Sequence, residues 1–208
     1  MALTKTRTES ILETGVCVAF PDWLQARVMA EGYWFERSWS EDSRMQLAVD
    51  LSRWNVEQGS GGPFGAAIFE SSSGRLIAVG VNRVMPDQDP TAHAEVMAIR
   101  MACQALSQFN LNQATSAGSY ALYSSAEPCC MCVGAVLWSG IKQVYFAAGR
   151  AVVESTGFDE GPETPPRDLV QRGVALTHLP GIDDRFATAA AEILRNYYQS
   201  GGLIYNGG

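Results

Sequence analysis

Hydrophobic positions in the first half of the chain repeat with two different periods. Apolar residues recur at helical spacing from Ser40 or Asp42, either of which can cap the helix, to about Gln58. Two short apolar runs follow at 66–70 and 76–82, separated by the turn-like sequence SSSG. This part of the chain is therefore expected to form one amphipathic helix and two strands.

From Pro90 onward, helices and strands are expected to alternate. One helix is expected to begin at Pro90, with Asp89 as its cap, and a shorter one at Pro128, ending near Gly140. The remaining pattern predicts strands at 119–125, 142–148 and 174–179 and a C-terminal helix at 183–199. This alternation is typical of an α/β protein with a layered sheet.

The pattern divides the chain into three parts. Residues 1–40 follow no clear period but contain several aromatic residues, which free tails rarely carry, so we expect an N-terminal extension that packs against the rest. Residues 41–180 hold most of the expected elements and form the main domain. Within it, residues 149–173 are rich in Glu, Asp, Pro and Gly, with a short helix expected at their start. Residues 181–208 form a C-terminal helix and a glycine-rich tail.

Composition and charge limit the classes of protein to which the chain can belong. It has 208 residues, of which 47% are hydrophobic, enough for a buried core. Its apolar runs are too short to span a bilayer and its first residues lack a secretory pattern, so a cytoplasmic protein without membrane contact is expected. The net charge of −7 argues against nucleic acid as the main partner, because proteins that bind it usually carry a basic face.

Three of the five cysteines lie close together in the sequence AEPCCMCVGAV at 126–136. The total of five cysteines is odd, which argues against a disulfide framework. Cys129 and Cys132 stand three apart in the first turn of the helix that Pro128 opens, so both thiols can reach one metal ion. The helix N-terminus also favours the thiolate form that binds metal. Cys130 is rotated away from that face and is expected to be a packing residue.

A third metal ligand is expected from His93, one of two histidines in the chain. It stands in the first turn of its own helix, and two helix starts at one sheet edge can direct their side chains at the same ion. An imidazole and two thiolates leave the fourth position of a zinc ion for water, which is typical of a catalytic site. Glu95, placed beside such a water, can accept its proton and pass it on.

Together these residues form the signature H-x-E followed by P-C-x-x-C, which is typical of zinc-dependent nucleobase deaminases. His93 by itself reads more readily as a hydrogen-bonded core histidine, and Cys129 and Cys132 as core thiols. Glu95 is also in order, and the two halves of the signature, H-x-E and P-C-x-x-C, each stand at the start of a helix that a proline opens. A functional site explains this arrangement much better than coincidence does. One zinc ion per subunit is the expected cofactor.

The chain resembles the cytidine-deaminase superfamily, and within it the bacterial guanine deaminases most closely. The segments GGPFGAAI, DPTAHAEVMAIR, EPCCMCVGAVLW and GFDE carry this resemblance, between about Met45 and Glu160. It implies a three-layer α/β fold of the cytidine-deaminase type, in which helices flank a central five-stranded mixed sheet. It also implies the zinc ligands named above and the role of Glu95 as proton shuttle.

The resemblance further implies residues that hold the base. Asn82 matches an asparagine that hydrogen-bonds the ring, although its spacing alone is that of an ordinary turn residue after a strand. Phe64 and Trp138 resemble aromatic residues that pack around the ring, and either could equally be a core residue. Backbone groups near Ala94 are expected to fix the edge of the ring.

A second acidic residue is implied by the GFDE segment, where guanine deaminases move protons to the leaving amine. Alignment places Glu160 there, with Asp159 as the adjacent candidate, while the subfamily carries aspartate at this place. The alternative is that these are solvated charges in an acidic segment. Tyr205 is the nearest match to a tyrosine that a swapped C-terminal segment lays over the partner's pocket, and a tail tyrosine without a role is the alternative. A homodimer is implied by the resemblance alone.

The implied activity is that of a hydrolase acting on a cyclic amidine, most closely the conversion of guanine to xanthine and ammonia. The acidic charge suits a small base better than tRNA. A tRNA adenosine deaminase, whose motifs are nearly the same, and a cytosine or cytidine deaminase remain alternatives. A catalytically silent zinc module used in assembly is the alternative outside the enzymes, and the intact Glu95 argues against it.

Overall fold

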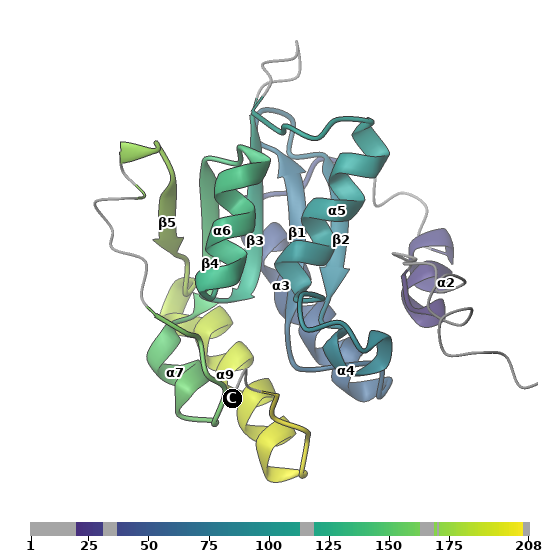
Figure 1. The fold of residues 1–208 in the computed structure, drawn as a ribbon, viewed down its shortest axis with the longest axis vertical. Coiled ribbons are helices and arrows are strands. Elements are labelled where there is room, and N and C mark those ends of the chain that lie inside the picture. The colour runs from purple at the N-terminus through teal and green to yellow at the C-terminus, as the bar shows by residue number, and fades with distance from the viewer. Residues whose placement is uncertain (1–19, 31–36, 113–118, 163–168, 170, 206–208) are drawn as a thin grey trace, which may run out of the picture.

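A single mixed sheet of five strands, in the order β2-β1-β3-β4-β5, forms the centre of the molecule (Figure 1). This computed structural model describes residues 20–30, 37–112, 119–162, 169 and 171–205. The strands are β1 (Gly65–Glu70), β2 (Leu76–Val81), β3 (Tyr120–Ala126), β4 (Gln143–Ala148) and β5 (Ala175–His178). Each lies within one or two residues of a strand that the apolar pattern predicts.

Strand direction changes at the middle of the sheet. β1 runs antiparallel to both β2 and β3, whereas β3, β4 and β5 run parallel to one another. Parallel neighbours need a crossover connection, and a helix provides it between β3 and β4. The end of β3 and the start of that helix therefore lie at one edge of the sheet.

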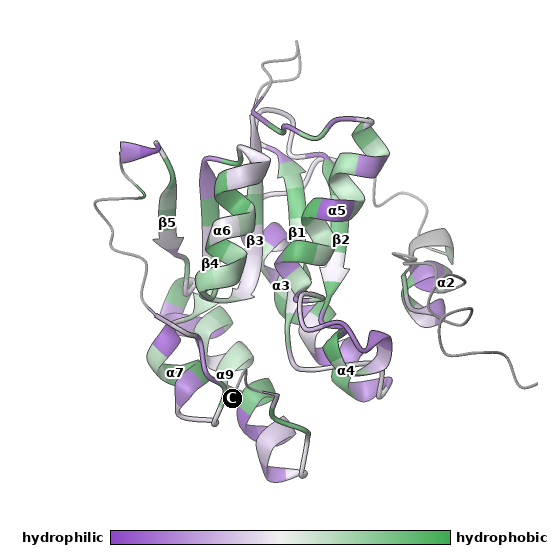
Figure 2. Cartoon of the chain, in the orientation of Figure 1, coloured by the Kyte–Doolittle hydropathy of each residue, from purple (hydrophilic) through white to green (hydrophobic). Residues whose placement is uncertain are grey.

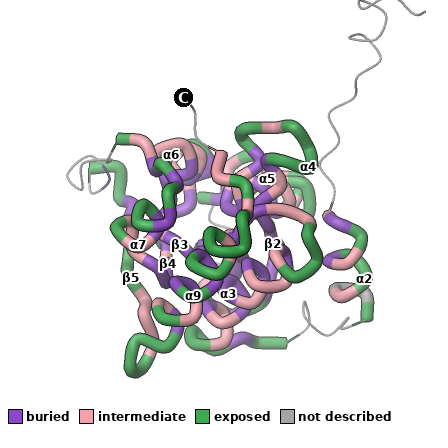
Figure 3. The backbone as a smooth tube through the Cα atoms, turned by 90° about the horizontal axis from the view of Figure 1, so that it is seen from below, coloured by how far each residue is buried: buried purple, intermediate pink, exposed green. Residues whose placement is uncertain are grey.

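Helices cover both faces of the sheet, as Figures 1 and 3 show. One face carries α5 (Ala94–Leu106) and α6 (Cys130–Ser139), and the other carries α3 (Glu41–Glu57) and α9 (Arg185–Gln199), with α7 (Arg150–Glu154) beside it. The predicted sheet between two helical layers is confirmed. The described ranges also contain α2 (Asp22–Ala30), α4 (Val84–Asp87) and a 3₁₀ turn, Ile182–Asp184. No helix in the described ranges is both long enough and apolar enough to cross a bilayer.

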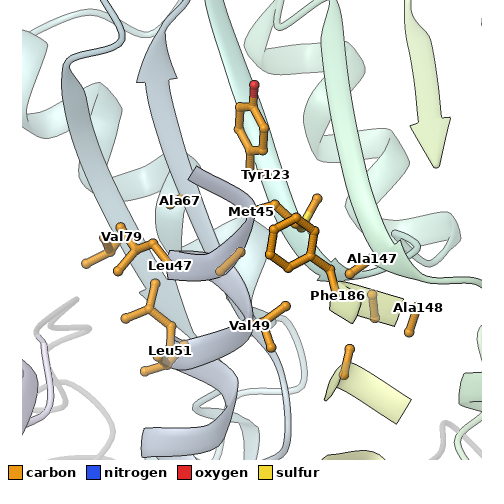
Figure 4. Packing of buried hydrophobic residues seen from close by; sticks show 14 of the residues in the cluster. Met45, Leu47, Val49, Leu51, Ala67, Val79, Tyr123, Ala147, Ala148 and Phe186 are labelled. Atoms are coloured by element: carbon orange, nitrogen blue, oxygen red, sulfur yellow. The ribbon is translucent and has the colours of Figure 1, made fainter. Parts of the chain in front are cut away.

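Two hydrophobic cores result, one on each face of the sheet. β1 and β2 are buried along their whole length, and Figure 2 shows them as mostly hydrophobic. Alternate residues of β1 belong to different cores, Ile68 to that of α5 and α6, and Phe69 to that of α3 and α9. Figure 4 shows Met45 and Phe186 in the second core, between the sheet and its helices.

Gly80 in β2 brings α5 unusually close to the sheet. A Cβ atom built at this position would lie 2.5 Å from the backbone nitrogen of Ala98 and would also overlap the carbonyl oxygen of Ala94. The first turns of α5 thus rest directly on the backbone of β2, because Gly80 has no side chain to separate them.

Several predicted boundaries were wrong. The helix expected from Pro90 begins at Ala94, because Asp89 accepts hydrogen bonds from the backbone and hydroxyl of Thr91 (2.8 and 2.6 Å) and closes a turn instead of capping a helix. The helix expected from Pro128 begins at Cys130. α4 and α2 lie where no element was predicted, α4 between the second strand and Asp89 and α2 in the N-terminal extension.

Within the described part of the extension, Leu24 is fully buried and the indole nitrogen of Trp23 donates to the hydroxyl of Ser60 at 2.6 Å. Residues 1–19 and 31–36 of the predicted extension, and 206–208 of the predicted tail, lie outside the described residues.

Candidate active site

Two helix N-termini meet at one edge of the sheet. His93 is the N-cap residue of α5, and Cys129 is that of α6; both have extended backbone angles, and neither side chain caps its own helix. Cys132 follows in the first turn of α6. The positive dipole ends of both helices favour negatively charged groups here, including thiolates.

The three predicted metal ligands have the spacing that zinc requires. The imidazole Nδ1 of His93 lies 3.5 Å from the sulfur of Cys129 and 3.6 Å from that of Cys132. Tetrahedral zinc with bonds of about 2.0–2.1 Å to nitrogen and about 2.3 Å to sulfur needs separations of about 3.5–3.6 Å. Among the described residues, no further His, Cys, Asp or Glu side chain joins this group. The donor set therefore fits a zinc ion with one position left for water.

The protonation of the two thiols agrees with a metal site. Hydrogen bonding with Cys132 lowers the pKa of Cys129 to about 4, although burial opposes the shift, and the same sharing of one proton raises the pKa of Cys132. A metal ion that binds here replaces the shared proton, because its ligands are thiolates.

Glu95 is the buried carboxylate of the site. One of its oxygens lies 3.4 Å from the sulfur of Cys132, and the other accepts a hydrogen bond from Ser124 at 3.3 Å. Burial raises the pKa of Glu95, and the charge of the nearby Cys129 adds to the rise. A carboxylate with a raised pKa can both take and return a proton near neutral pH.

A cavity of about 340 Å³ opens beside the metal ligands. Its walls come from the ends of β1, β2 and β3, the starts of α5 and α6, the loop after α7 and the C-terminal tail. The lining residues are Phe64, Asn82, Val84, Pro90, His93, Glu95, Ala126, Glu127, Cys129, Cys130, Met131, Phe158, Asp159, Glu160, Gly161 and Tyr205. A cavity of this size can hold a single purine or pyrimidine base.

Asn82 presents a hydrogen-bond donor to this cavity. Its side-chain oxygen accepts from the backbone N–H groups of Gly62 and Val84, both at 3.3 Å, and its amide nitrogen donates to the hydroxyl of Tyr205. The ring of Tyr205 meets that of His93 edge-on, with centroids 5.9 Å apart. The structure thus places Tyr205 over the pocket of its own chain.

Glu160 and Asp159 differ sharply in their surroundings. Glu160 is 8% exposed, and burial raises its pKa to about 8, with the charges of Cys129 and Glu95 adding to the rise. Asp159 is exposed, and its carboxylate accepts the backbone N–H of Gly161 at 2.8 Å. Of the two candidates, Glu160 has the buried position and the raised pKa of an acid that can donate a proton.

The part of the chain that holds the metal ligands also matches a known protein family. Residues 38–148, more than half of the chain, match the cytidine and deoxycytidylate deaminase zinc-binding region. The chain belongs to this deaminase family. The match runs from just before α3 to the end of β4, so it includes every residue of the predicted zinc site, and the predicted resemblance is confirmed.

Individual deaminases are similar over larger parts of the chain. Guanine deaminase from Bacillus subtilis is 42% identical over 121 residues, which cover 58% of this chain and 72% of that protein. The tRNA-specific adenosine deaminase of Agrobacterium fabrum is 35% identical over 142 residues, or 66% and 80% of the two chains. A solved guanine deaminase from Nitrosomonas europaea superposes with a TM-score of 0.76 at 35% identity, covering 89% of this chain and 97% of that one.

Two predicted residues of this deaminase do not line the cavity. Trp138 is 90% exposed and does not line it, so the expectation that it packs around the ring is wrong for the pocket of one chain. It stands six residues after Cys132, about 9 Å further along the axis of α6 at 1.5 Å per residue. Ala94 is fully buried at the start of α5 and is not a lining residue either, and the role of its backbone stays a prediction.

One aromatic residue of the deaminase pocket was not predicted. Phe158 is buried between the rings of Phe64 and Tyr205, with centroid distances of 4.9 and 5.4 Å. Its position as the one hydrophobic residue in the GFDE segment was the available signal. Cys130, predicted to pack, is half-buried and lies against Gly161.

Proposed function

We propose that this chain hydrolyses guanine to xanthine and ammonia. The observation that carries the proposal is the pair of buried carboxylates, Glu95 and Glu160, that line one base-sized cavity with the metal ligands. Guanine deaminases are among the relatives that match most of this chain. The reaction moves both protons of one water molecule, one to the ring and one to the leaving amine, and two carboxylates can share these transfers.

His93, Cys129 and Cys132 would hold the zinc ion, and the ion, when bound, makes a coordinated water acidic enough to act as nucleophile near neutral pH. Glu95 accepts one proton of the attacking water while the oxygen of that water bonds to C2 of guanine. Glu95 then returns the proton to ring N3. Glu160, protonated near neutral pH, donates to the exocyclic amine as the C2–N bond breaks and ammonia leaves. The hydroxyl on C2 becomes the carbonyl group of xanthine by releasing the second proton of the attacking water, which restores the proton of Glu160.

The remaining residues of the cavity orient the base. Because backbone groups hold the oxygen of Asn82, its amide N–H₂ group points to the pocket and requires an acceptor on the substrate. Guanine offers the acceptors O6 and N7. Phe64, Phe158 and Tyr205 supply aromatic surface against which a flat ring can pack.

Ammonia release separates this proposal from its rivals. Zinc-loaded protein is offered guanine, adenine, cytosine, cytidine and a tRNA anticodon stem-loop, and ammonia is measured in each case. We expect release from guanine. Release from the stem-loop but not from guanine would favour a tRNA adenosine deaminase, and zinc content without ammonia from any substrate would favour a silent zinc module.

A homodimer and a cytoplasmic location are the other parts of the proposal. Apolar surface supports the dimer, because Trp138 on α6 and Phe109 are 90% and 84% exposed. The backbone of Leu111 donates to Ser139 at 2.7 Å, so both aromatic residues lie near the same end of α6. Sedimentation should show a dimer that Trp138→Glu weakens and that the matched control Ile182→Glu, at another exposed apolar residue, leaves intact. Cell fractionation tests the location.

A further inference from the structure

The loop that carries Glu160 is attached through its own backbone to the edge of the sheet where the metal ligands lie, here called the metal edge. The carbonyl oxygen of Glu160 accepts the N–H of Cys130 at 3.3 Å, and the carbonyl oxygen of Gly161 accepts a hydrogen bond from the guanidinium of Arg150. Gly161 has φ +67°, and a Cβ built there would lie 2.6 Å from the sulfur of Cys130. The loop therefore lies in direct contact with the residue next to a metal ligand.

Arg150 is itself held by the turn that carries the metal ligands. Its backbone N–H, the first of α7, donates to the carboxylate of Glu127 at 2.8 Å. Glu127 precedes Cys129 by two residues, and its own N–H donates to the carbonyl oxygen of Ala148 at 2.8 Å. The end of β4, the turn after β3 and the Glu160 loop are thus tied together through one arginine.

We propose that Arg150 is a positioning residue that holds the carboxyl group of Glu160 at the metal edge. The inference rests on the proposed function, in which Glu160 donates to the leaving amine. Arg150 does not line the cavity; its guanidinium holds the loop at the carbonyl oxygen of Gly161, and its charge also lowers the pKa of Glu160, against the larger effect of burial. Its side chain is 20% exposed, and Glu154, its other partner at 2.7 Å, is 45% exposed.

This contact bears on catalysis because Glu160 lies in the described segment 155–162, which contains no helix or strand. α7 ends before it, at Glu154. A proton donor must stay within hydrogen-bond reach of the leaving group, and misplacement by about 1 Å can cost on the order of 10²-fold in rate. The two backbone contacts from Cys130 and Arg150 supply the placement that a helix or strand provides elsewhere in the site.

Steady-state kinetics of Arg150→Ala, Arg150→Lys and the control Glu154→Ala test the proposal. Arg150→Ala should lower kcat for guanine at least tenfold, with KM within about threefold and zinc content unchanged, because Glu160 acts only as the amine leaves. Arg150→Lys should recover part of kcat, since its ammonium group can still donate to the carbonyl oxygen of Gly161. Glu154→Ala should stay within twofold. Equal loss in the Ala and Lys variants, or no loss in either, would overturn the proposal.

A double-mutant cycle shows whether Arg150 acts through Glu160. In a Glu160→Gln background, Arg150→Ala should lower kcat by less than twofold, because the group it positions is already disabled. Fully additive losses would assign Arg150 a separate role and overturn the proposal. If Arg150→Ala does not fold, Arg150→Met, which keeps the length of the side chain, replaces it in each comparison.

Alkylation of Cys130 reports on the loop without any turnover. In zinc-loaded protein, peptide mapping after iodoacetamide should show Cys130 modified several-fold faster in Arg150→Ala than in wild type or Glu154→Ala, because Gly161 no longer covers its sulfur. Unchanged labelling would overturn the positioning role. If wild type releases no ammonia from guanine while Cys130 labelling changes as expected, the proposed function fails and the structural role of Arg150 stands.

Discussion

The two walls of the cavity are built in different ways. The metal wall consists of His93, Cys129 and Cys132 at two helix starts, where the sheet and its crossover set their positions. The second wall consists of the 158–161 loop and the C-terminal tail, which reach the cavity through a few side-chain and backbone contacts. The first wall depends on secondary structure and the second on tertiary contacts, so changes in them should affect different steps of the reaction.

Loss of a metal ligand should have the largest effect. Cys132→Ala removes one of two thiolates, so zinc is lost and ammonia release falls below detection. The melting temperature should also fall, because the bound zinc ion no longer stabilises the folded chain. Elemental analysis and thermal unfolding check the result. Retained zinc with full activity would place the metal elsewhere.

Removal of the proton shuttle should leave the same wall intact and still stop turnover. Glu95→Ala is expected to keep its zinc and to lower kcat for guanine by about 10³-fold or more, within the range for general acid–base groups. Zinc content and ammonia release are measured on the same sample. A fully active Glu95→Ala enzyme would exclude the shuttle role.

Substitutions in the second wall should cause a smaller loss of rate. Glu160→Gln is expected to lower kcat by about 10²-fold, whereas Asp159→Asn, the matched control at the exposed neighbour, should change it by less than about threefold. An acid donates only when protonated, so wild-type kcat should fall as the pH rises through the raised pKa of Glu160, and the Gln variant should lack this decline. The reverse ranking of the two variants would move the second acid to Asp159.

The tail should give the smallest effect. Tyr205→Phe keeps the ring against His93 and Phe158 but removes the hydroxyl that accepts from Asn82. A net hydrogen bond contributes about 0.5–1.5 kcal/mol, so KM for guanine should fall about two- to tenfold once the amide is available to the base. Kinetics of Tyr205→Phe beside Tyr197→Phe, a tyrosine outside the cavity, check this. A rise in KM would mean that the hydroxyl holds the substrate itself.

The same contrast explains what the sequence could predict. The zinc ligands were predictable because His93 and Cys129 begin helices and ligand spacing within a turn is local. The sheet followed from its apolar runs. Trp138 was assigned wrongly because a motif gives no position along the helix axis relative to the cavity, and Phe158 was missed because its role depends on rings from β1 and the tail. α2 lacks a clear apolar period, so its helix could not be predicted.

Gly80 has a consequence for how this site tolerates change. α5 rests on the backbone of β2 at this glycine. The position of His93, at the start of α5, is therefore set by the backbone of the sheet and not by a packed side chain. Core side chains can be exchanged extensively as long as total volume and patterning are kept, and such exchanges leave this backbone contact unchanged. A single methyl group at position 80, which does not line the cavity, would lift the helix and carry the histidine away from its metal.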